Sequence, residues 1–271
     1  MNDRENTLTA DSGMKVLNRD IIKYIAVFVM FWGHLFAWLA LMRNPDAADP
    51  YDFMPLWQQI ISHFALFCPP VMFFFVTDGY KFTRDRKKYA LRLLVFACIT
   101  QIPDWLVFQP INGWWTSNVI FTLFFGLLAI IAWESGYKKW QRIALVILAA
   151  AASLLVQSDW MVFGVVFILL LHIYRDRPKA RFAAYMSVAL LWKLLYILIS
   201  VGKAPLPRIM ANTVLDLVPV ILAYLCMTIF YNGKKGRHPV FAKWFFYAFY
   251  PLHYIVIWII YVYKINCDLF Q

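Results

Sequence analysis

Long runs of apolar residues alternate with short polar and charged segments along the whole chain. A helix that crosses a bilayer needs about 20 mostly apolar residues, because the hydrocarbon core is about 30 Å thick and each residue adds about 1.5 Å. This pattern predicts an all-α, polytopic membrane bundle of about nine transmembrane helices. The predicted spans are 19–42, 57–80, 89–108, 117–134, 141–157, 160–174, 182–201, 211–231 and 241–263.

The polar segments between these runs are short, and they set the expected domain organisation. The fifth and sixth spans are separated only by Gln157-Ser158-Asp159, which predicts a tight helical hairpin whose second arm is short and tilted or incomplete. The N-terminus lacks the pattern of a signal peptide, so the first run is expected to be an uncleaved anchor. The expected parts are a polar cytoplasmic segment 1–18, a single transmembrane domain 19–263 and a short external tail 264–271.

Composition supports a membrane rather than a soluble protein. The 271 residues are 62% hydrophobic and 15% charged, with a mean hydropathy of +0.61. Soluble domains are about 45–50% apolar and about 25% charged. Lipid must therefore be part of the solvent, and no soluble domain is large enough to carry the function alone.

The net charge of +11 is explained by membrane orientation. If the nine spans are drawn across a bilayer, 21 of the 26 Lys and Arg residues lie on one side and four on the other, with Lys193 inside a span. Positive loops stay in the cytoplasm, so the N-terminus is predicted inside and the C-terminus outside. Because topology accounts for the charge, membrane lipid is an expected partner and nucleic acid is not.

Two histidines interrupt apolar spans at opposite ends of the chain. His34 lies in the first span, toward its outer face, and His253 lies near the middle of the last span. Ionisable groups inside spans are costly and often functional, and an imidazole can act as a general base near neutral pH. The alternative is a buried, hydrogen-bonded histidine. His63, near the outer start of the second span, is a weaker candidate, and His172 and His238 are expected to be solvated at the cytoplasmic interface.

Three further charged residues have competing interpretations. Asp78 ends an apolar run, and its simplest role is a salt bridge to a nearby cation such as Arg84. Asp159 is expected to cap the helix that follows it. Lys193 could extend toward the interface, pair with an acid or hold an anionic group.

Basic residues cluster at the predicted cytoplasmic end of the second and third spans. The residues Lys81, Arg84, Lys88 and Arg92 are spaced by steps of three, four and four, which on one helix places them in one stripe. Such a stripe suits a polyanion, through charge-assisted bonds to phosphate. The alternative is the positive-inside bias together with anionic lipid headgroups. The four cysteines show no metal-ligand spacing, so no metal site is predicted.

Four stretches of sequence together resemble the TraX family of membrane acetyltransferases, whose namesake acetylates the N-terminus of F-pilin. The most specific runs from Phe73 through Asp78-Gly79-Tyr80 to Pro103. The others are Asp20-Ile21-Ile22-Lys23 with Met30 and His34, then Asn118-Val119-Ile120-Phe121-Thr122 with Gly126 and Ser158-Asp159-Trp160, and last Phe249-Tyr250-Pro251-Leu252-His253. Two positions depart from the family: Gly33 stands where an acid often precedes the histidine, and Asp78 where Glu is common.

The resemblance implies an acyltransferase of a bacterial inner membrane that moves an acetyl group from acetyl-CoA to an amine or hydroxyl. For such an enzyme, the residues expected to bind the acyl-CoA are Lys81, Arg84, Lys88, Tyr89 and Arg92. The residues expected to be catalytic are His34 or His253 as base, Asp78, and Asn118 or Tyr250 as oxyanion donors. The acceptor is left open among a pilin-like N-terminus, an envelope sugar and a small amine.

Two other classes of function compete with the enzyme. A transporter or lipid-handling protein would use His34, His253 and Lys193 as a proton or substrate path, and paired broken helices would support it. A purely structural membrane protein would leave these intramembrane groups unexplained.

Overall fold

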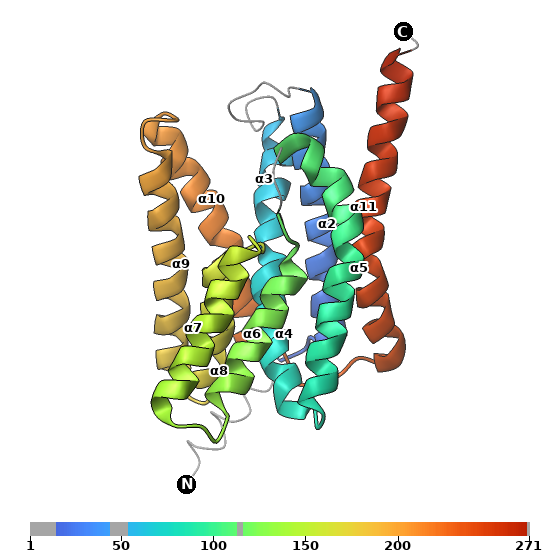
Figure 1. The fold of residues 1–271 in the computed structure, drawn as a ribbon. Helices are drawn as coiled ribbons and strands as arrows, with labels where there is room; N and C mark the ends of the chain where they lie inside the picture. Colours follow the sequence, from blue (N-terminus) through green and yellow to red (C-terminus); the bar gives the residue numbers. More distant parts are fainter. Residues whose placement is uncertain (1–14, 44–53, 113–115, 270–271) are drawn as a thin grey trace, which may run out of the picture. The chain divides into compact units, whose positions relative to one another are not determined.

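The computed structural model describes residues 15–43, 54–112 and 116–269, and within these ranges the chain is helical without strands (Figure 1). The predicted all-α fold is therefore confirmed for the part described. Each predicted span coincides with a helical stretch. These are α2 (Arg19–Arg43), α3 (Leu56–Phe64) continued by η2 (Ala65–Phe67) and α4 (Cys68–Phe82), α5 (Arg86–Asn112), α6 (Val119–Trp133), α7 (Lys139–Leu155), α8 (Met161–Ile173), α9 (Pro178–Ser200), α10 (Leu206–Leu225) continued by η3 (Cys226–Phe230), and α11 (Pro239–Leu269).

Six of these stretches are long and apolar enough to cross a membrane. They are α2, the α3–α4 stretch, α5, α9, the α10–η3 stretch and α11. The remaining helices α6, α7 and α8 have 15, 17 and 13 residues. At 1.5 Å per residue they are about 20–26 Å long, shorter than the roughly 30 Å hydrocarbon core. The number of helices that cross the membrane stays a prediction.

The chain divides into two compact units, each assembled from separate stretches of sequence. The first unit contains residues up to Val71 together with Tyr196–Trp244, and the second contains Met72–Leu195 and the residues from Phe245 onward. Several helices therefore begin in one unit and end in the other. The predicted single domain 19–263 stays a prediction.

In the first unit, α2 packs closely against the second helical stretch. A Cβ atom added at Gly33 would lie 2.6 Å from Ala65 Cβ and 3.0 Å from the carbonyl oxygen of Ile61. Only glycine allows this approach without displacing backbone, so the departure from the family at position 33 has a packing reason. A carboxylate side chain at this position would collide with the neighbouring helix.

In the second unit, two of the three short helices, α6 and α8, pack on each other through glycines. Gly126 of α6 lies against Ile168 of α8, and Gly164 of α8 lies against Thr122 of α6. The fully buried Phe73 and Phe167 fill the space beside them. This packing brings the N-terminal ends of α6 and α8 together, and a backbone bridge joins Ser117 to Ser158.

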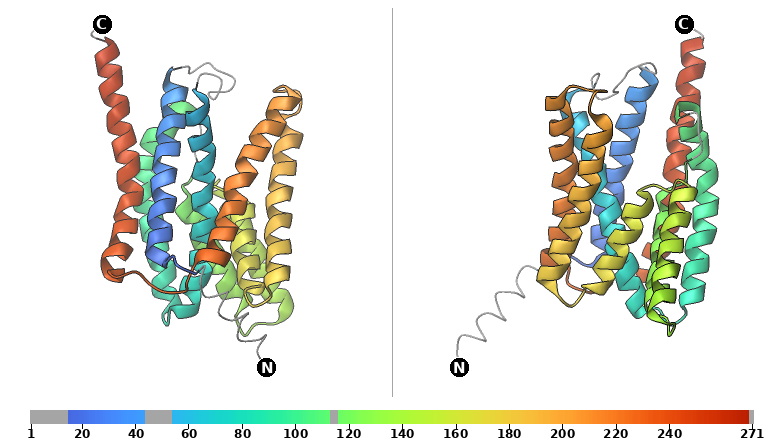
Figure 2. Two further views of the ribbon diagram at one scale, coloured as in Figure 1. Left: turned by 180° about the vertical axis from the view of Figure 1, so that it is seen from behind. Right: turned by 60° about the vertical axis from the view of Figure 1, so that its left-hand side comes forward.

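One end of each short helix lies beside the middle of α5: α6 and α8 begin there, and α7 ends there. Figures 1 and 2 show the start of α6 and the turn between α7 and α8 beside the middle of α5. The hydrogen bonds agree, because Asn118 at the start of α6 contacts Ala97 and Gln101 in the middle of α5. The predicted helical hairpin with a short second arm is confirmed, with its tip inside the second unit.

Candidate functional site

A buried polar core surrounds the start of α6 in the second unit. Asn118 is 2% exposed, and its side-chain oxygen accepts a hydrogen bond from the backbone N–H of Ile120, which caps the helix. Its amide nitrogen donates to the carbonyl of Ala97 and to Oε1 of Gln101, both at 2.9 Å. Because both amide hydrogens are used within the protein, the geometry gives Asn118 a scaffolding role, and its predicted oxyanion role stays a prediction.

Two carboxylates belong to the same polar core. Asp104 on α5 is 3% exposed, accepts a hydrogen bond from Gln101 Nε2 at 3.2 Å and is hydrogen-bonded to the hydroxyl of Tyr254 on α11. Asp159, in the turn between α7 and α8, interacts electrostatically with both Asp104 and Tyr254. Asp104, held by a phenol and an amide between apolar helices, can donate and accept a proton where lipid would otherwise exclude charge.

The structure places His253 and Tyr250 beside this core, in the middle of α11. The His253 ring is 2% exposed, and its centroid lies 3.9 Å from that of Tyr254 and 5.2 Å from that of Tyr250. The second unit thus brings together predicted candidates His253 and Tyr250 with Asp104 and Tyr254. The group contains an imidazole, two phenols and a carboxylate, which are side chains that act as general acids and bases in enzymes.

The turn between α7 and α8 has an unusual backbone. Gln157, Trp160 and Met161 have φ angles of 49°, 65° and 39°, which is rare for residues other than glycine. Each such residue costs of order 1–3 kcal/mol, and such strain often occurs at functional sites. Buried hydroxyls hold the turn: Ser153 and Ser158 are bonded at 2.6 Å, and Thr122 bonds to both Ser158 and the carbonyl of Asp159.

The prediction that Asp159 caps α8 is wrong. The N-cap is Trp160, which makes no side-chain cap, while Asp159 lies one residue earlier and accepts a hydrogen bond from the Trp160 backbone N–H.

Lys193 on α9 is 2% exposed, and its Nζ lies 4.4 Å from the ring centroid of Trp192, which stacks on Trp160. Its three interpretations remain open.

The first unit contains a second polar group inside apolar helices. His63 on α3 is bonded through Nδ1 to Oδ1 of Asp216 on α10 at 2.6 Å. His34 lies on α2 directly after Gly33, which packs on α3 next to Ser62. His34 and His253 belong to different units, and their expected convergence stays a prediction. His63 also belongs to the first unit, and it is buried and bonded to Asp216, which its position in the sequence did not indicate.

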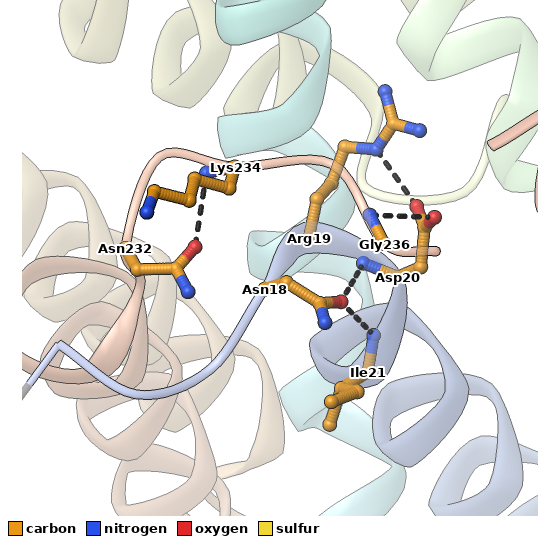
Figure 3. Close-up of polar contacts among 7 residues, drawn as sticks. All are labelled: Asn18, Arg19, Asp20, Ile21, Asn232, Lys234 and Gly236. Atoms are coloured by element: carbon orange, nitrogen blue, oxygen red, sulfur yellow. Dashed lines mark hydrogen bonds and ion pairs between the residues drawn. The ribbon is translucent and has the colours of Figure 1, made fainter. Parts of the chain in front are cut away.

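A buried carboxylate fixes the start of α2 in the first unit (Figure 3). Asp20 is 4% exposed and accepts hydrogen bonds from Arg19 Nε at 2.9 Å and from the backbone N–H of Gly236 at 3.0 Å. The backbone carbonyl of Lys234 accepts a hydrogen bond from the Arg19 backbone N–H at 3.0 Å, and the side chain of Asn18 caps the helix. The motif that begins at Asp20 therefore joins α2 to the segment after η3.

The predicted basic stripe is divided between two helices, so the expectation of one helical face is wrong. Lys81 lies on α4, Arg84 in the turn Thr83–Asp85, and Lys88 and Arg92 on α5. The helix breaks there because Asp85 accepts a hydrogen bond from the backbone N–H of Lys88 at 2.9 Å and starts α5. That hydrogen bond lowers the pKa of Asp85, with the Lys88 ammonium adding to the effect.

The cluster still gathers at one end of the second unit. Lys81, Arg84 and Lys88 are exposed, whereas Tyr89 packs against Gly79. The Arg92 guanidinium lies 5.8 Å from the Tyr89 ring centroid and is hydrogen-bonded to Tyr247 of α11. Asp78, near the end of α4, is half-buried, and its predicted role stays a prediction.

Two histidines expected to be solvated differ. His238 is exposed, as predicted. His172 is 3% exposed, which contradicts the prediction, because its Nε2 is bonded to Glu134 at 2.8 Å and its ring packs against Tyr80. Residue spacing alone could not predict this pairing, because α7 lies between Glu134 and His172 in the sequence.

Several residues of the polar groups were not identified from the sequence. Gln101, Asp104 and Tyr254 looked like ordinary polar and aromatic positions in apolar runs, and Asp216 was overlooked. The acidic residues carried a usable signal, because a carboxylate within a predicted span is rare. Gln101 and Tyr254 carried none, since amides and phenols are common near membrane interfaces.

Comparisons with known proteins agree with the motifs. A family model described as "TraX protein" matches residues 18–261. A relative from Dichelobacter nodosus, named "Probable fimbrial assembly protein FimC, serogroup H1", is 32% identical over 241 residues, which cover 86% of this chain and 91% of the relative. No solved structure matches the chain. The match spans nearly all of the helices described above, so the chain belongs to the TraX family.

Proposed function

We propose that the protein is a membrane-embedded acyltransferase that moves an acetyl group from acetyl-CoA to an amine or hydroxyl. The observation that carries the proposal is the buried polar core of the second unit. There, His253 lies beside a phenol–carboxylate hydrogen bond between Tyr254 and Asp104, within helices long enough to cross a membrane. Such a group can accept and return protons away from bulk water, which is what acyl transfer requires.

The basic end of the second unit supports the donor side of the proposal. Lys81, Arg84 and Lys88 are exposed there and can form charge-assisted bonds to the phosphates of CoA. Tyr89 and Arg92 are partly buried beside them, and they are proposed to bind the rest of the acetyl-CoA molecule. The division of the cluster between α4 and α5 suits a ligand with several phosphates, because cations can approach it from two helices.

The proposed reaction is direct transfer. The acceptor nucleophile attacks the thioester carbonyl carbon, an intramembrane histidine takes the acceptor proton, and the CoA thiolate leaves. The sequence-based candidates for that histidine are His34 and His253. Tyr250 is proposed as an oxyanion donor, and a single donor of this kind contributes roughly 3–4 kcal/mol in known enzymes. Asp78 completes the proposed set, and Asn118 supports it by capping α6.

The relative's printed role in fimbrial assembly supports a pilin-like acceptor over an envelope sugar or a small amine. We also propose a bacterial inner-membrane location, with the N-terminus in the cytoplasm and the C-terminus outside. The Lys and Arg residues support this orientation, because 21 of 26 lie in segments that would then face the cytoplasm.

The short helices modify the proposed path of the chain through the membrane. The loops before α7 and after α8 are both basic, and the turn between the two helices lies beside the middle of α5. We therefore propose that α7 and α8 form a re-entrant hairpin that enters and leaves on the cytoplasmic side. The six long helices then cross, and α6 returns the chain from the level of the middle of α5 to the cytoplasmic side, which keeps the two ends of the chain on opposite sides.

One observation favours a second function, transport. Helices interrupted in mid-membrane form substrate sites in many transporters, and α6 and α8 begin side by side within the second unit. A transporter would move an intact solute, whereas an acyltransferase splits its donor. Uptake of labelled acetyl-CoA into proteoliposomes, with both halves of the molecule recovered together, would favour transport.

The proposed function is tested with purified protein and acetyl-CoA labelled in the acetyl group. Binding and release of free CoA thiol are measured for the wild type and for three variants. His34→Ala and His253→Ala are expected to lower turnover while acetyl-CoA binding survives, whereas Arg84→Ala should weaken binding. Absence of acetyl-CoA binding by the wild type at millimolar concentration would contradict the proposal.

A further inference from the structure

Cations gather at one end of the first unit, where the segment after η3 meets the start of α2. The described segments 15–23 and 231–244 contain seven Lys and Arg residues: Lys15, Arg19, Lys23, Lys234, Lys235, Arg237 and Lys243. Their only acid is Asp20, which is buried and bonded to Arg19. The side chains of Lys234, Lys235 and Arg237 are exposed, so this end of the unit has a strongly positive surface.

Hydrogen bonds fix the segment that carries these cations against α2. The carbonyl of Lys234 accepts from the Arg19 N–H at 3.0 Å, and the Gly236 N–H donates to the Asp20 carboxylate at 3.0 Å. The Lys234 N–H donates to the side chain of Asn232 at 2.9 Å. Figure 3 shows the Lys234 side chain extending away from Asp20. Cations on a fixed segment can bind an anion without the entropy that ordering a flexible loop would cost.

Large apolar side chains follow these cations directly in the sequence. Val240, Phe241 and Trp244 at the start of α11 are 70%, 65% and 52% exposed. The ammonium of the exposed Lys243 lies 4.9 Å from the Trp244 ring centroid. Tryptophan is favoured at the boundary between membrane and water, and cations beside exposed aromatic side chains suit an anionic lipid surface. A soluble anion would need the cations but not the apolar side chains.

An exposed apolar face runs along α2 from the same end. Ile21, Ile25, Phe28 and Trp32 are spaced by steps of four, three and four, which places them on one side of the helix, and all four are exposed. At 1.5 Å per residue this face is about 16 Å long, which is close to the thickness of one leaflet of the hydrocarbon core. A lipid whose headgroup lies at the start of α2 therefore has an apolar face for its acyl chain.

We propose that this end of the first unit binds an anionic phospholipid. Lys234, Lys235 and Arg237 hold the headgroup phosphate, and Phe241 and Trp244 lie at the boundary between headgroup and acyl chains. The proposal does not rest on acyl transfer. Clusters of about four to eight cations beside a membrane helix attract anionic lipids. The positive-inside bias accounts for the number of cations, but it requires neither a fixed segment nor exposed aromatic side chains beside them.

The experiment titrates the purified full chain in mild detergent with dioleoylphosphatidylglycerol or dioleoylphosphatidylcholine. Bound lipid is counted by native mass spectrometry. The wild type is expected to bind phosphatidylglycerol at least roughly tenfold more tightly than phosphatidylcholine. The double variant Lys234→Gln/Lys235→Gln should bind phosphatidylglycerol roughly 25-fold more weakly, because each cation near an anionic lipid contributes about fivefold. Its binding of phosphatidylcholine should be unchanged.

Two further variants separate this site from net charge. Arg177→Gln/Lys179→Gln removes two exposed cations from the second unit, on the side that is also predicted to be cytoplasmic, and should change phosphatidylglycerol binding by less than about twofold. Gly236→Ala keeps every charge but places a Cβ 2.6 Å from Asp20 Oδ2, which should displace the segment. It is therefore expected to weaken phosphatidylglycerol binding although the net charge is unchanged.

Four results would overturn the proposal. The first is wild-type affinity for phosphatidylglycerol in Lys234→Gln/Lys235→Gln, whose exposed positions should leave the fold intact. The second is an equal loss in the two double variants, since net charge would then decide binding. Unchanged binding by folded Gly236→Ala would show that the fixed segment is not needed. Full displacement of phosphatidylglycerol by millimolar inorganic phosphate would assign the cations to a soluble anion instead.

Discussion

Replacing Asn118 tests whether the polar core of the second unit depends on a helix cap. Asn118→Ala removes the acceptor for the Ile120 N–H and the donors to Ala97 and Gln101. Loss of an N-cap costs about 1 kcal/mol. Each of the two lost donor bonds adds about 0.5–1.5 kcal/mol. We therefore expect Asn118→Ala to lower the free energy of unfolding by about 2–4 kcal/mol, with turnover falling as folded protein is lost.

A second variant separates the cap from the donors. Asn118→Ser keeps an oxygen that can cap α6 but loses the amide hydrogens, so it should recover about 1 kcal/mol of the loss. Unfolding is followed in mild detergent by titration with SDS. Ser187→Ala is the control, because Ser187 is an exposed helical hydroxyl that bonds only within α9 among the contacts described.

The result that would refute this reasoning is specific. If Asn118→Ala unfolded at the same SDS concentration as the wild type but lost turnover per folded protein, the cap would contribute little. The side chain would then act on the substrate directly, as the oxyanion role predicted from the sequence requires.

Two further predictions concern close contacts of glycine. Gly236→Ala would place a Cβ 2.6 Å from Asp20 Oδ2, so it should displace the hydrogen bond that joins the start of α2 to the segment after η3 and lower the unfolding midpoint. Gly136→Ala is its control, since nothing lies within 4 Å of the added Cβ, and an unchanged midpoint is expected there. Gly33→Ala would place a Cβ 2.6 Å from that of Ala65 and should destabilise the first unit, as measured by faster proteolysis; equal proteolysis of variant and wild type would contradict the packing argument.

The helical fold could be predicted because a helix that enters a membrane requires a continuous run of apolar residues. Each predicted span coincides with a helical stretch, since length and hydropathy are properties of neighbouring residues. Hydropathy did not distinguish full spans from partial ones, because α6 and α8 are as apolar as the long helices. Their shortness depends on where Asn118 and the α7–α8 turn meet α5, which is a tertiary contact.

The polar groups were only partly predictable for the same reason. His253 could be predicted because a histidine in an apolar run is conspicuous, and Tyr250 was predicted as a donor in the same stretch of sequence. Their neighbour Asp104 acquires meaning only through Tyr254, which is far away in the sequence. The contact between His63 and Asp216 could not be predicted, because the two residues are 153 positions apart in the sequence. Long-range pairing of polar residues is fixed by helix packing, which residue spacing does not encode.

The acyltransferase claim is tested most directly with acetyl-CoA that carries different labels on its two halves. Purified wild-type protein in sealed proteoliposomes is supplied with this donor and with a peptide that has a free N-terminal amine. We predict that the acetyl label appears on the peptide while the CoA label is recovered as free thiol in equal amount. Recovery of both labels together, whether outside or inside the vesicles, would contradict acyl transfer.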